Sequence, residues 1–179
     1  MQELQLRPMT DDEFDAYRAR LIPEHAAARV GAGEWGAHEA QGLATKAVND
    51  LLPAGLETPG MLLLTAKTPD GNVLGYLWLA VNQSISPSRA YIYYIDIVPE
   101  QRGKGYGRTL LHAAELESAQ YGAEVIALNV FATNAVARSL YSASGYEITS
   151  LTMRKKLSPE SGTGVAQHEW QGSRRTGGA

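Results

Sequence analysis

Residues 101–108 are the part of the chain whose residue types and spacing point most directly to chemistry. Three glycines alternate there with other residues, at Gly103, Gly105 and Gly107. Glycine lets a backbone approach a ligand closely, and the first N–H groups of a helix have no partner within that helix. Three basic side chains add formal positive charge: Arg102, Lys104 and Arg108. A β-branched and aromatic run precedes the segment and an amphipathic pattern follows it, so the segment predicts a pyrophosphate site at the start of a helix.

Two well-known phosphate loops do not fit this segment. A dinucleotide-binding fingerprint needs a third glycine three residues after the second, but that position holds Arg108 in the first possible register and Leu110 in the next. A nucleoside-triphosphate loop needs Gly-Lys followed by Ser or Thr, whereas Lys104 is followed by Gly105. No hydroxyl is therefore in place for magnesium.

The pattern that remains is Arg102-x-x-Gly105-x-Gly107, preceded by Ile97-Val98-Pro99-Glu100. It resembles the acyl-CoA-binding loop of the GNAT superfamily of N-acetyltransferases. A second segment resembles the same family in the expected order: a strand over residues 125–131, then Asn134, then a helix with Leu140-Tyr141 and a Gly145-Tyr146 exit. The conjunction of the two motifs is far more specific than either alone.

The N-terminal part resembles a bacterial subgroup of GNAT proteins whose acceptors are mostly unassigned. The matching segments are residues 9–14, the Gly33-Glu34-Trp35 turn, Leu51-Leu52-Pro53 and Leu56-x-Thr58-Pro59. The resemblance thus covers residues 9–157, and it names the acetyl donor but not the acceptor.

The resemblance implies transfer of an acetyl group from acetyl-CoA to an amine by direct attack within a ternary complex. Backbone donors at the end of the strand before the loop would hold the pantetheine arm, and the loop would hold the pyrophosphate. The positions implied for cofactor binding are Ile95, Ile97, Val98, Arg102, Gly103, Lys104, Gly105, Tyr106, Gly107, Arg108, Asn134 and Tyr141. No metal is expected, because the four histidines have no metal-ligand spacing and the chain has no cysteine.

Two of these positions have catalytic roles by the resemblance. The N–H of Ile97 would face the thioester oxygen, and Tyr141 would be the general acid that protonates the departing thiolate. The alternatives are an ordinary buried strand and a tyrosine that packs on a helix face. Asn134 would bind the CoA arm, cap the helix that follows it, or do both.

The general base is the least certain assignment from the sequence. Family members carry a Glu either early in the strand before the loop or on the later strand, and those positions hold Tyr91 and Asn129 here. Asp96 is the one carboxylate inside the first of these strands, so it is the candidate base, acting directly or through water. Its alternative role is a structural partner for a nearby Arg or Lys.

Two functions remain open. One is an N-acetyltransferase for a small-molecule, peptide or protein amine; the other is a non-catalytic module that senses acyl-CoA. The empty base positions favour the sensor slightly, whereas the presence of Tyr141 favours the enzyme. Tyr91, Tyr93 and Tyr94, and the Glu34-Trp35 pair, could contribute to an acceptor pocket.

Composition restricts the partners. The 179 residues suit one domain, and 16 Lys and Arg against 19 Asp and Glu give a net charge of −3, with no global attraction to nucleic acid. The absence of cysteine excludes disulfides and a thiol-borne acyl intermediate. The start has no signal-peptide pattern, and no apolar run approaches membrane-spanning length, so we expect a soluble cytoplasmic protein. Dimers are frequent in the superfamily, so a homodimer is a further expectation.

The expected fold is a mixed, twisted α/β sheet of about six to seven strands with helices on both faces. Strands are predicted over residues 4–7, 61–67, 73–81, 90–98, 125–131 and 146–155. Helices are predicted from a Thr10–Glu13 capping box toward residue 29, over 37–52, over 105–121, and after Asn134. In the resembled family the strands on either side of the loop and its helix are parallel neighbours that splay apart. Residues 1–157 would form a single domain, and the Gly- and Ser-rich residues 158–179 a flexible tail.

Overall fold

The structure, a computed structural model, describes residues 3–82, 87–155 and 157. Residues 1–146 belong to one compact unit, and a second unit begins at Glu147, with no regular secondary structure among its described residues. The elements of the first unit follow the order β1 (Gln5–Pro8), α1 (Asp11–Gly31), α2 (Ala40–Leu51), η1 (Gly55–Glu57), β2 (Met61–Lys67), β3 (Val73–Asn82), β4 (Arg89–Ile97), η2 (Pro99–Gln101), α3 (Tyr106–Gln120), β5 (Val125–Leu128) and α4 (Ala135–Ala143). The predicted tail, residues 158–179, lies outside the described residues.

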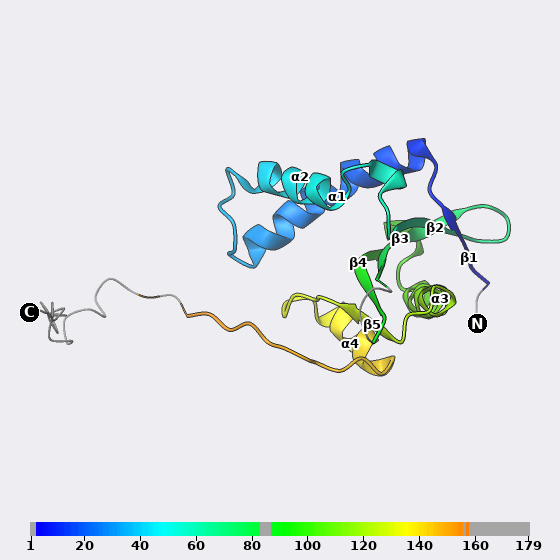
Figure 1. Ribbon diagram of the computed structural model, residues 1–179. Helices are drawn as coiled ribbons and strands as arrows, with labels where there is room; N and C mark the ends of the chain where they lie inside the picture. The colour runs from blue at the N-terminus through cyan, green and yellow to red at the C-terminus, as the bar shows by residue number, and fades with distance from the viewer. Residues whose placement is uncertain (1–2, 83–86, 156, 158–179) are drawn as a thin grey trace, which may run out of the picture. The chain divides into compact units, whose positions relative to one another are not determined.

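The strands form one five-stranded sheet in the order β1-β2-β3-β4-β5 (Figure 1). The first four strands are antiparallel, and β5 is parallel to β4 because the connection between them crosses back through α3. The predicted hairpin between β2 and β3 is confirmed, with Gly71 at a φ of 89° in its turn. The predicted mixed α/β class is therefore confirmed, with five strands among the described residues in place of six to seven.

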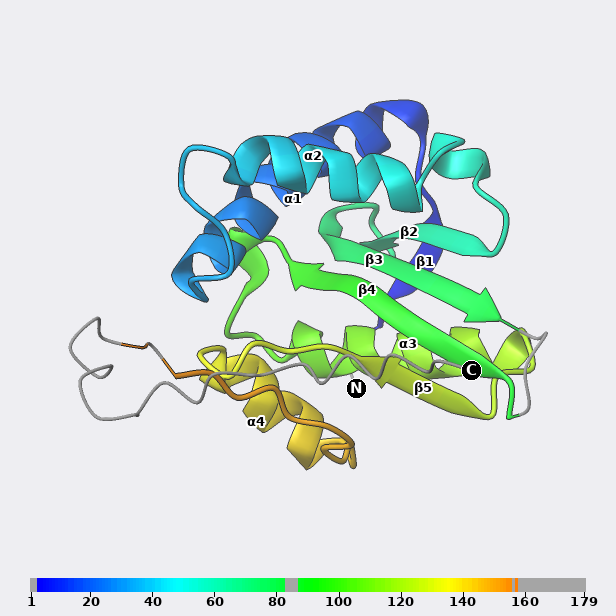
Figure 2. The ribbon, with the colours of Figure 1, turned by 60° about the vertical axis from the view of Figure 1, so that its left-hand side comes forward.

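Helices cover both faces of the sheet, as predicted (Figure 2). Helices α1 and α2 pack on one face, where Tyr17 and Val48 meet Trp78. Helix α3 packs on the other face, where Leu110 and Leu111 meet Leu77 of β3. Residues of α4 join this second cluster at its margin. The carboxyl end of β4 thus lies between the layer of α1 and α2 and the layer of α3.

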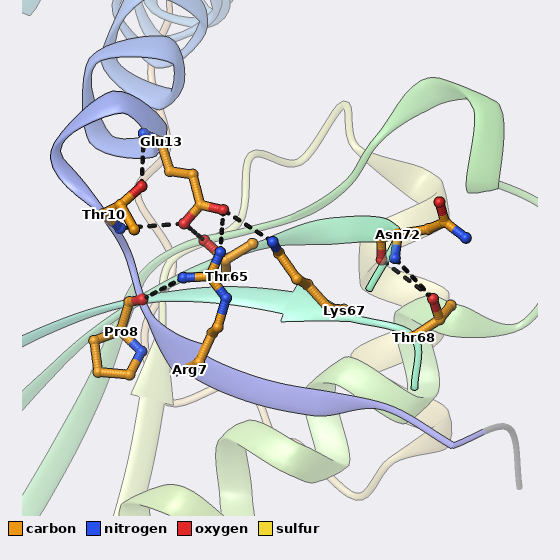
Figure 3. A network of polar contacts seen from close by, with 8 residues as sticks. All are labelled: Arg7, Pro8, Thr10, Glu13, Thr65, Lys67, Thr68 and Asn72. Carbon is orange, nitrogen blue, oxygen red and sulfur yellow. Dashed lines mark hydrogen bonds and ion pairs between the residues drawn. The ribbon is translucent and has the colours of Figure 1, made fainter. Parts of the chain in front are cut away.

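The N-terminus of α1 is tied to the sheet through Glu13 (Figure 3). The predicted capping box is confirmed, since the Thr10 side chain accepts from the Glu13 N–H and the Glu13 carboxylate accepts from the Thr10 N–H. The same carboxylate accepts from the Thr65 hydroxyl at 2.9 Å and pairs with Arg7 and Lys67. One side chain therefore caps a helix and joins it to β1 and β2.

Two predicted strands differ from the structure. The strand predicted over residues 125–131 ends at Leu128, because its pairing with β4 ends there. The strand predicted over residues 146–155 is wrong, since the structure pairs none of these described residues in the sheet, and Ile148, Leu151 and Met153 are exposed. A strand needs a neighbour for its N–H and C=O groups, so β-branched and apolar residues alone do not define one.

Candidate functional site

Strands β4 and β5 part near the middle of β4. Their parallel register runs only from Arg89 beside Val125 to Ile92 beside Leu128, whereas β4 continues to Ile97. Figure 2 shows the two strands diverging toward their carboxyl ends. Beyond Ile92, one edge of β4 is thus left without a β5 partner, which agrees with the splay that the family resemblance implies.

The N–H groups of Ile95 and Ile97 face this open edge. Val98 donates its N–H to the carbonyl of Leu74 on β3, at 2.9 Å. Successive N–H groups of a strand point to opposite edges, so those of Ile97 and Ile95 point away from β3. Two of the predicted backbone donors are therefore directed toward the opening, and the N–H of Val98 is not.

A β-bulge lies where the strands part. The β3–β4 register pairs Trp78 with Tyr94 but Leu79 with Ile92, which leaves Tyr93 as an extra residue on β4. Ile92 and Ile95 both face the α3 side as a result. Further along, Gly75 of β3 passes so close to β4 that a Cβ would lie 2.1 Å from the carbonyl oxygen of Asp96. The end of β4 is thus shaped by a bulge on one strand and a glycine on the other.

The glycine loop leads from β4 into α3 in the predicted way. Gly103 and Gly105 have φ values of 73° and 87°, a region that residues with a side chain rarely adopt. Gly105 is the N-cap of α3 and supplies no side-chain cap, so the N–H groups of Tyr106 and Gly107 have no partner within the helix. A Cβ at Gly103 or Gly105 would meet no atom within 4 Å. Bare backbone therefore borders open space, which fits the pyrophosphate of acetyl-CoA.

The three basic side chains of the loop have different partners. Arg102 turns back onto β4, where its Nε donates to the Ile97 carbonyl at 2.8 Å. Lys104 donates to the Gln101 side chain at 3.0 Å. Arg108 lies in the first turn of α3 and is exposed. Arg108 is thus the side chain most freely available to an anion at this helix end.

Asp96, the predicted base, lies between two arginines. Its carboxylate pairs with Arg20 of α1 and accepts from Arg102 at 3.1 and 3.4 Å. Burial raises the pKa of Asp96, and the two arginines oppose that effect while Glu24 reinforces it. The structural alternative for Asp96, a partner for nearby arginines, is therefore realised in the structure.

Helix α4 carries Tyr141, and Asn134 is its N-cap residue. The Asn134 side chain caps α4 by accepting from the Ala137 N–H at 3.1 Å, as one of its predicted roles required. A Cβ on Gly107 would lie 3.5 Å from Leu140, so α4 packs directly against the start of α3. Burial raises the pKa of Tyr141. Its hydroxyl therefore stays protonated at neutral pH.

The sequence reasoning missed a polar cluster on α1. Arg20 joins Asp96 and Glu24, and its guanidinium lies 5.2 Å from the centroid of the Tyr76 ring. Tyr94 donates its hydroxyl to Glu24 at 2.6 Å. The i, i+4 spacing of Arg20 and Glu24 indicates a shared helix face, but it does not indicate that this face packs against β4.

The Glu34-Trp35 pair, singled out as a possible acceptor element, packs around Arg29. Arg29 pairs with Glu34, and its guanidinium lies 5.5 Å from the Trp35 ring centroid and 5.6 Å from that of Phe131. Phe131 follows β5 just beyond the point where the strands part. The turn after α1 is thereby brought beside the opening.

The described residues contain neither a metal-binding cluster nor a membrane-spanning helix. No group of three or more His, Cys, Asp or Glu side chains in residues 3–82, 87–155 and 157 is placed to hold a metal ion. Within the same residues, no helix has the length and apolar character needed to cross a membrane.

Comparison with known proteins gives consistent results. The model of the Acetyltransferase (GNAT) family matches residues 47–146, more than half of the chain. The uncharacterized N-acetyltransferase YycN of Bacillus subtilis is 35% identical over 154 residues, which cover 86% of this chain and 99% of YycN. A mycothiol acetyltransferase of Propionibacterium freudenreichii is 30% identical over 82% of this chain but only 44% of its own length.

Solved structures show the same relationship. The crystal structure of YycN matches with a TM-score of 0.84 at 35% identity, covering 87% of this chain and 99% of that one. The structure of AAC(6')-Iy in complex with a CoA-based bisubstrate analogue shares the fold, with a TM-score of 0.57 at 16% identity, covering 88% of this chain and 99% of that one. From its motifs, its sheet and these relatives, the chain belongs to the GNAT family of acetyltransferases.

Proposed function

We propose that this acetyltransferase moves an acetyl group from acetyl-CoA to a primary amine of a small molecule, peptide or protein, by direct attack in a ternary complex. The observation that carries the proposal is the open edge of β4, where the N–H groups of Ile95 and Ile97 face the gap left by β5. The glycine loop and the start of α3 follow directly from that edge. Two groups of backbone donors, one on the edge of β4 and one at the start of α3, can thus hold an extended amide-containing arm and the pyrophosphate at its end.

The chain's own groups have distinct roles in this proposal. Bound acetyl-CoA supplies the activated thioester. The N–H of Ile97 stabilises negative charge on the thioester oxygen, and a preset donor of this kind is typically worth roughly 3 kcal/mol in acyl transfer. Tyr141 gives its proton to the departing sulfur. A phenol with a pKa of ~10 or above holds that proton until a thiolate, whose conjugate acid has a pKa of ~8.5, develops beside it.

The need for a base depends on the acceptor. At pH 7, deprotonation costs roughly 4 to 5 kcal/mol for a lysine amine but only about 1 kcal/mol for an α-amino group. The role of Asp96 as the general base stays a prediction. Because Asp96 pairs with two arginines, that role needs an experiment of its own. An α-amino or other low-pKa acceptor fits the site best, because it needs little help to lose its proton.

The acceptor side lies between α1 and the parting strands in this proposal. Trp35 and Phe131 flank Arg29 there, and Tyr91 and Tyr93 pack edge to face with centroids 4.9 Å apart. A relative is named mycothiol acetyltransferase, and a protein of the same fold is named aminoglycoside antibiotic 6'-N-acetyltransferase, which supports a small amine-bearing acceptor. A cytoplasmic location and a homodimer stay predictions from the sequence and the family.

Titration calorimetry with acetyl-CoA, followed by free-thiol release against amines and peptide N-termini, tests this function. We expect binding, and thiol release above the hydrolysis background with at least one acceptor class. Binding without release across a wide panel would instead favour an acyl-CoA sensor. No binding of acetyl-CoA would overturn the proposal.

A further inference from the structure

Arg102 connects the cofactor loop to the end of β4. Its Nε donates to the Ile97 carbonyl, and its terminal nitrogen donates to the Asp96 carboxylate. We infer that Asp96 is a positioning residue that holds the acetyl-CoA loop in place through Arg102, in place of the base role considered above. The inference rests on the proposed binding of acetyl-CoA at this loop.

The Ile97 carbonyl is the first contact that gives Arg102 this role. In a strand, the C=O of a residue points to the same edge as its N–H, so the Ile97 carbonyl also faces the open edge of β4. Arg102 occupies that carbonyl and leaves the neighbouring N–H available. The guanidinium thus lies at the end of the open edge of β4, where the chain enters the glycine loop. In this proposal it fixes the distance between the strand that binds the pantetheine arm and the loop that binds the pyrophosphate.

Asp96 keeps the Arg102 side chain in this position. The side chain of Arg102 is 54% exposed, so without a partner it would sample many rotamers. Asp96 is only 19% exposed and is itself anchored by Arg20 from α1. The guanidinium therefore makes two hydrogen bonds, one to a fixed carboxylate and one to a backbone carbonyl, and together they restrict the orientation of the Arg102 side chain.

The Arg20 side of the cluster is fixed as well. Arg20 pairs with Glu24 one turn along α1 and stacks on the Tyr76 ring of β3. Helix α1, strand β4 and the loop are therefore linked through one carboxylate. By contrast, a base must take up a proton from the amine, and the two guanidinium charges beside Asp96 oppose its protonation.

The test compares Asp96→Asn with the wild type for acetyl-CoA affinity and for kcat at saturating cofactor. We expect the Kd for acetyl-CoA to rise about 5- to 10-fold, as for a lost charge-assisted hydrogen bond at a partly exposed site. We expect kcat to stay within about twofold and its pH profile to keep its shape. A large fall in kcat with loss of the acidic limb and an unchanged Kd would establish the base role and overturn the inference.

Arg102→Lys and Glu24→Gln supply the matched controls. Lysine keeps the charge but lacks the fork, so Arg102→Lys should raise the Kd as much as Asp96→Asn does, and the double variant should raise it little further. Glu24→Gln alters Arg20 and Tyr94 without touching Arg102, so its Kd should stay within about twofold of the wild type. Wild-type affinity in Arg102→Lys, or an equal loss in Glu24→Gln, would overturn the inference. A wild-type protein that binds no acetyl-CoA would overturn the proposed function first, and the two failures are thereby distinct.

Discussion

Two carboxylates, Glu13 and Asp96, connect α1 to the sheet, and their pKa values are shifted in opposite directions. Glu13 lies at the start of α1 and Asp96 at the end of β4, and their side chains are almost equally exposed, at 17% and 19%. Each pairs with two cations. Yet the pKa of Glu13 is lowered, whereas that of Asp96 is raised.

The two sites differ in depth of burial and in uncharged donors, because Asp96 lies deeper among surrounding atoms and Glu13 receives neutral hydrogen-bond donors. Burial raises the pKa of Glu13 too, but hydrogen bonds from the Thr10 N–H and the Thr65 hydroxyl, together with Lys67 and Arg7, outweigh it. Asp96 receives hydrogen bonds from arginines alone and also meets the negative charge of Glu24, so burial dominates. Glu13 sits in a site built to hold its charge. Asp96 sits in a site where burial disfavours its charge.

The largest effect should come from the loop beside Asp96. Gly105→Asp places a side chain and an anion where the pyrophosphate is proposed to lie, so we expect acetyl-CoA binding to be lost in calorimetry. Gly71→Asp is a matched control at the Glu13 end, because Gly71 has nearly the same φ, 89° against 87°, and equally open space. Both variants bear the same backbone strain, so equal losses of binding would refute the placement of the cofactor.

The second-largest effect is expected from the proposed general acid, Tyr141. Tyr141→Phe should lower kcat by about 100-fold, the lower range for a general acid, while acetyl-CoA affinity stays unchanged. Tyr146→Phe removes a hydroxyl from the neighbouring ring, 5.7 Å away between centroids, and should leave kcat within about twofold. Steady-state kinetics with a working acceptor measures both, and similar losses in the two variants would assign the effect to packing.

Glu13→Gln tests the contrast between Glu13 and Asp96 through the stability of the folded protein. We expect a loss of about 1–3 kcal/mol in the free energy of unfolding at pH 7, because several donors lose a charged partner. Since the native pKa is lowered, the stabilisation is present above the unfolded pKa and disappears as pH falls through the native pKa. Urea unfolding at a series of pH values measures this, with acetyl-CoA affinity unchanged as the control.

Asp96→Asn should give the smallest stability effect and the opposite pH trend. With a raised native pKa, the folded protein binds more protons than the unfolded chain, so wild-type stability falls relative to the variant as pH rises above the ordinary carboxyl pKa of ~4. The same urea series reports it, and a trend parallel to that of Glu13→Gln would erase the distinction between the two sites.

Features encoded within a few neighbouring residues could be predicted from the sequence. The capping box at Thr10, the Asp70-Gly71 turn, the glycine loop and the Asn134 cap depend on short-range chemistry, and the structure contains each of them. The motif also placed Tyr141 on a helix that packs against the start of α3.

Features that depend on distant partners could not be predicted. The pairing of Arg20 with Asp96 joins residues far apart in sequence, and their types alone give no hint of it. The end of β5 at Leu128 is set by where β4 turns away, not by the residues that follow it. Likewise, the apolar residues near Ile148 read as a strand, but a strand requires a partner that the pattern cannot name.

The extra residue at Tyr93 changes the phase of β4 halfway along its length. Before it, Ile92 faces α3; after it, Ile95 and Ile97 face α3 as well, and Tyr94 and Asp96 turn toward α1. Deletion of Tyr93 would reverse the second half of the strand, so that Asp96 would face α3 and Ile97 would face Arg20. The inserted residue is therefore a spacer that lets one strand be structural support in its first half and the proposed acetyl-CoA-binding edge in its second.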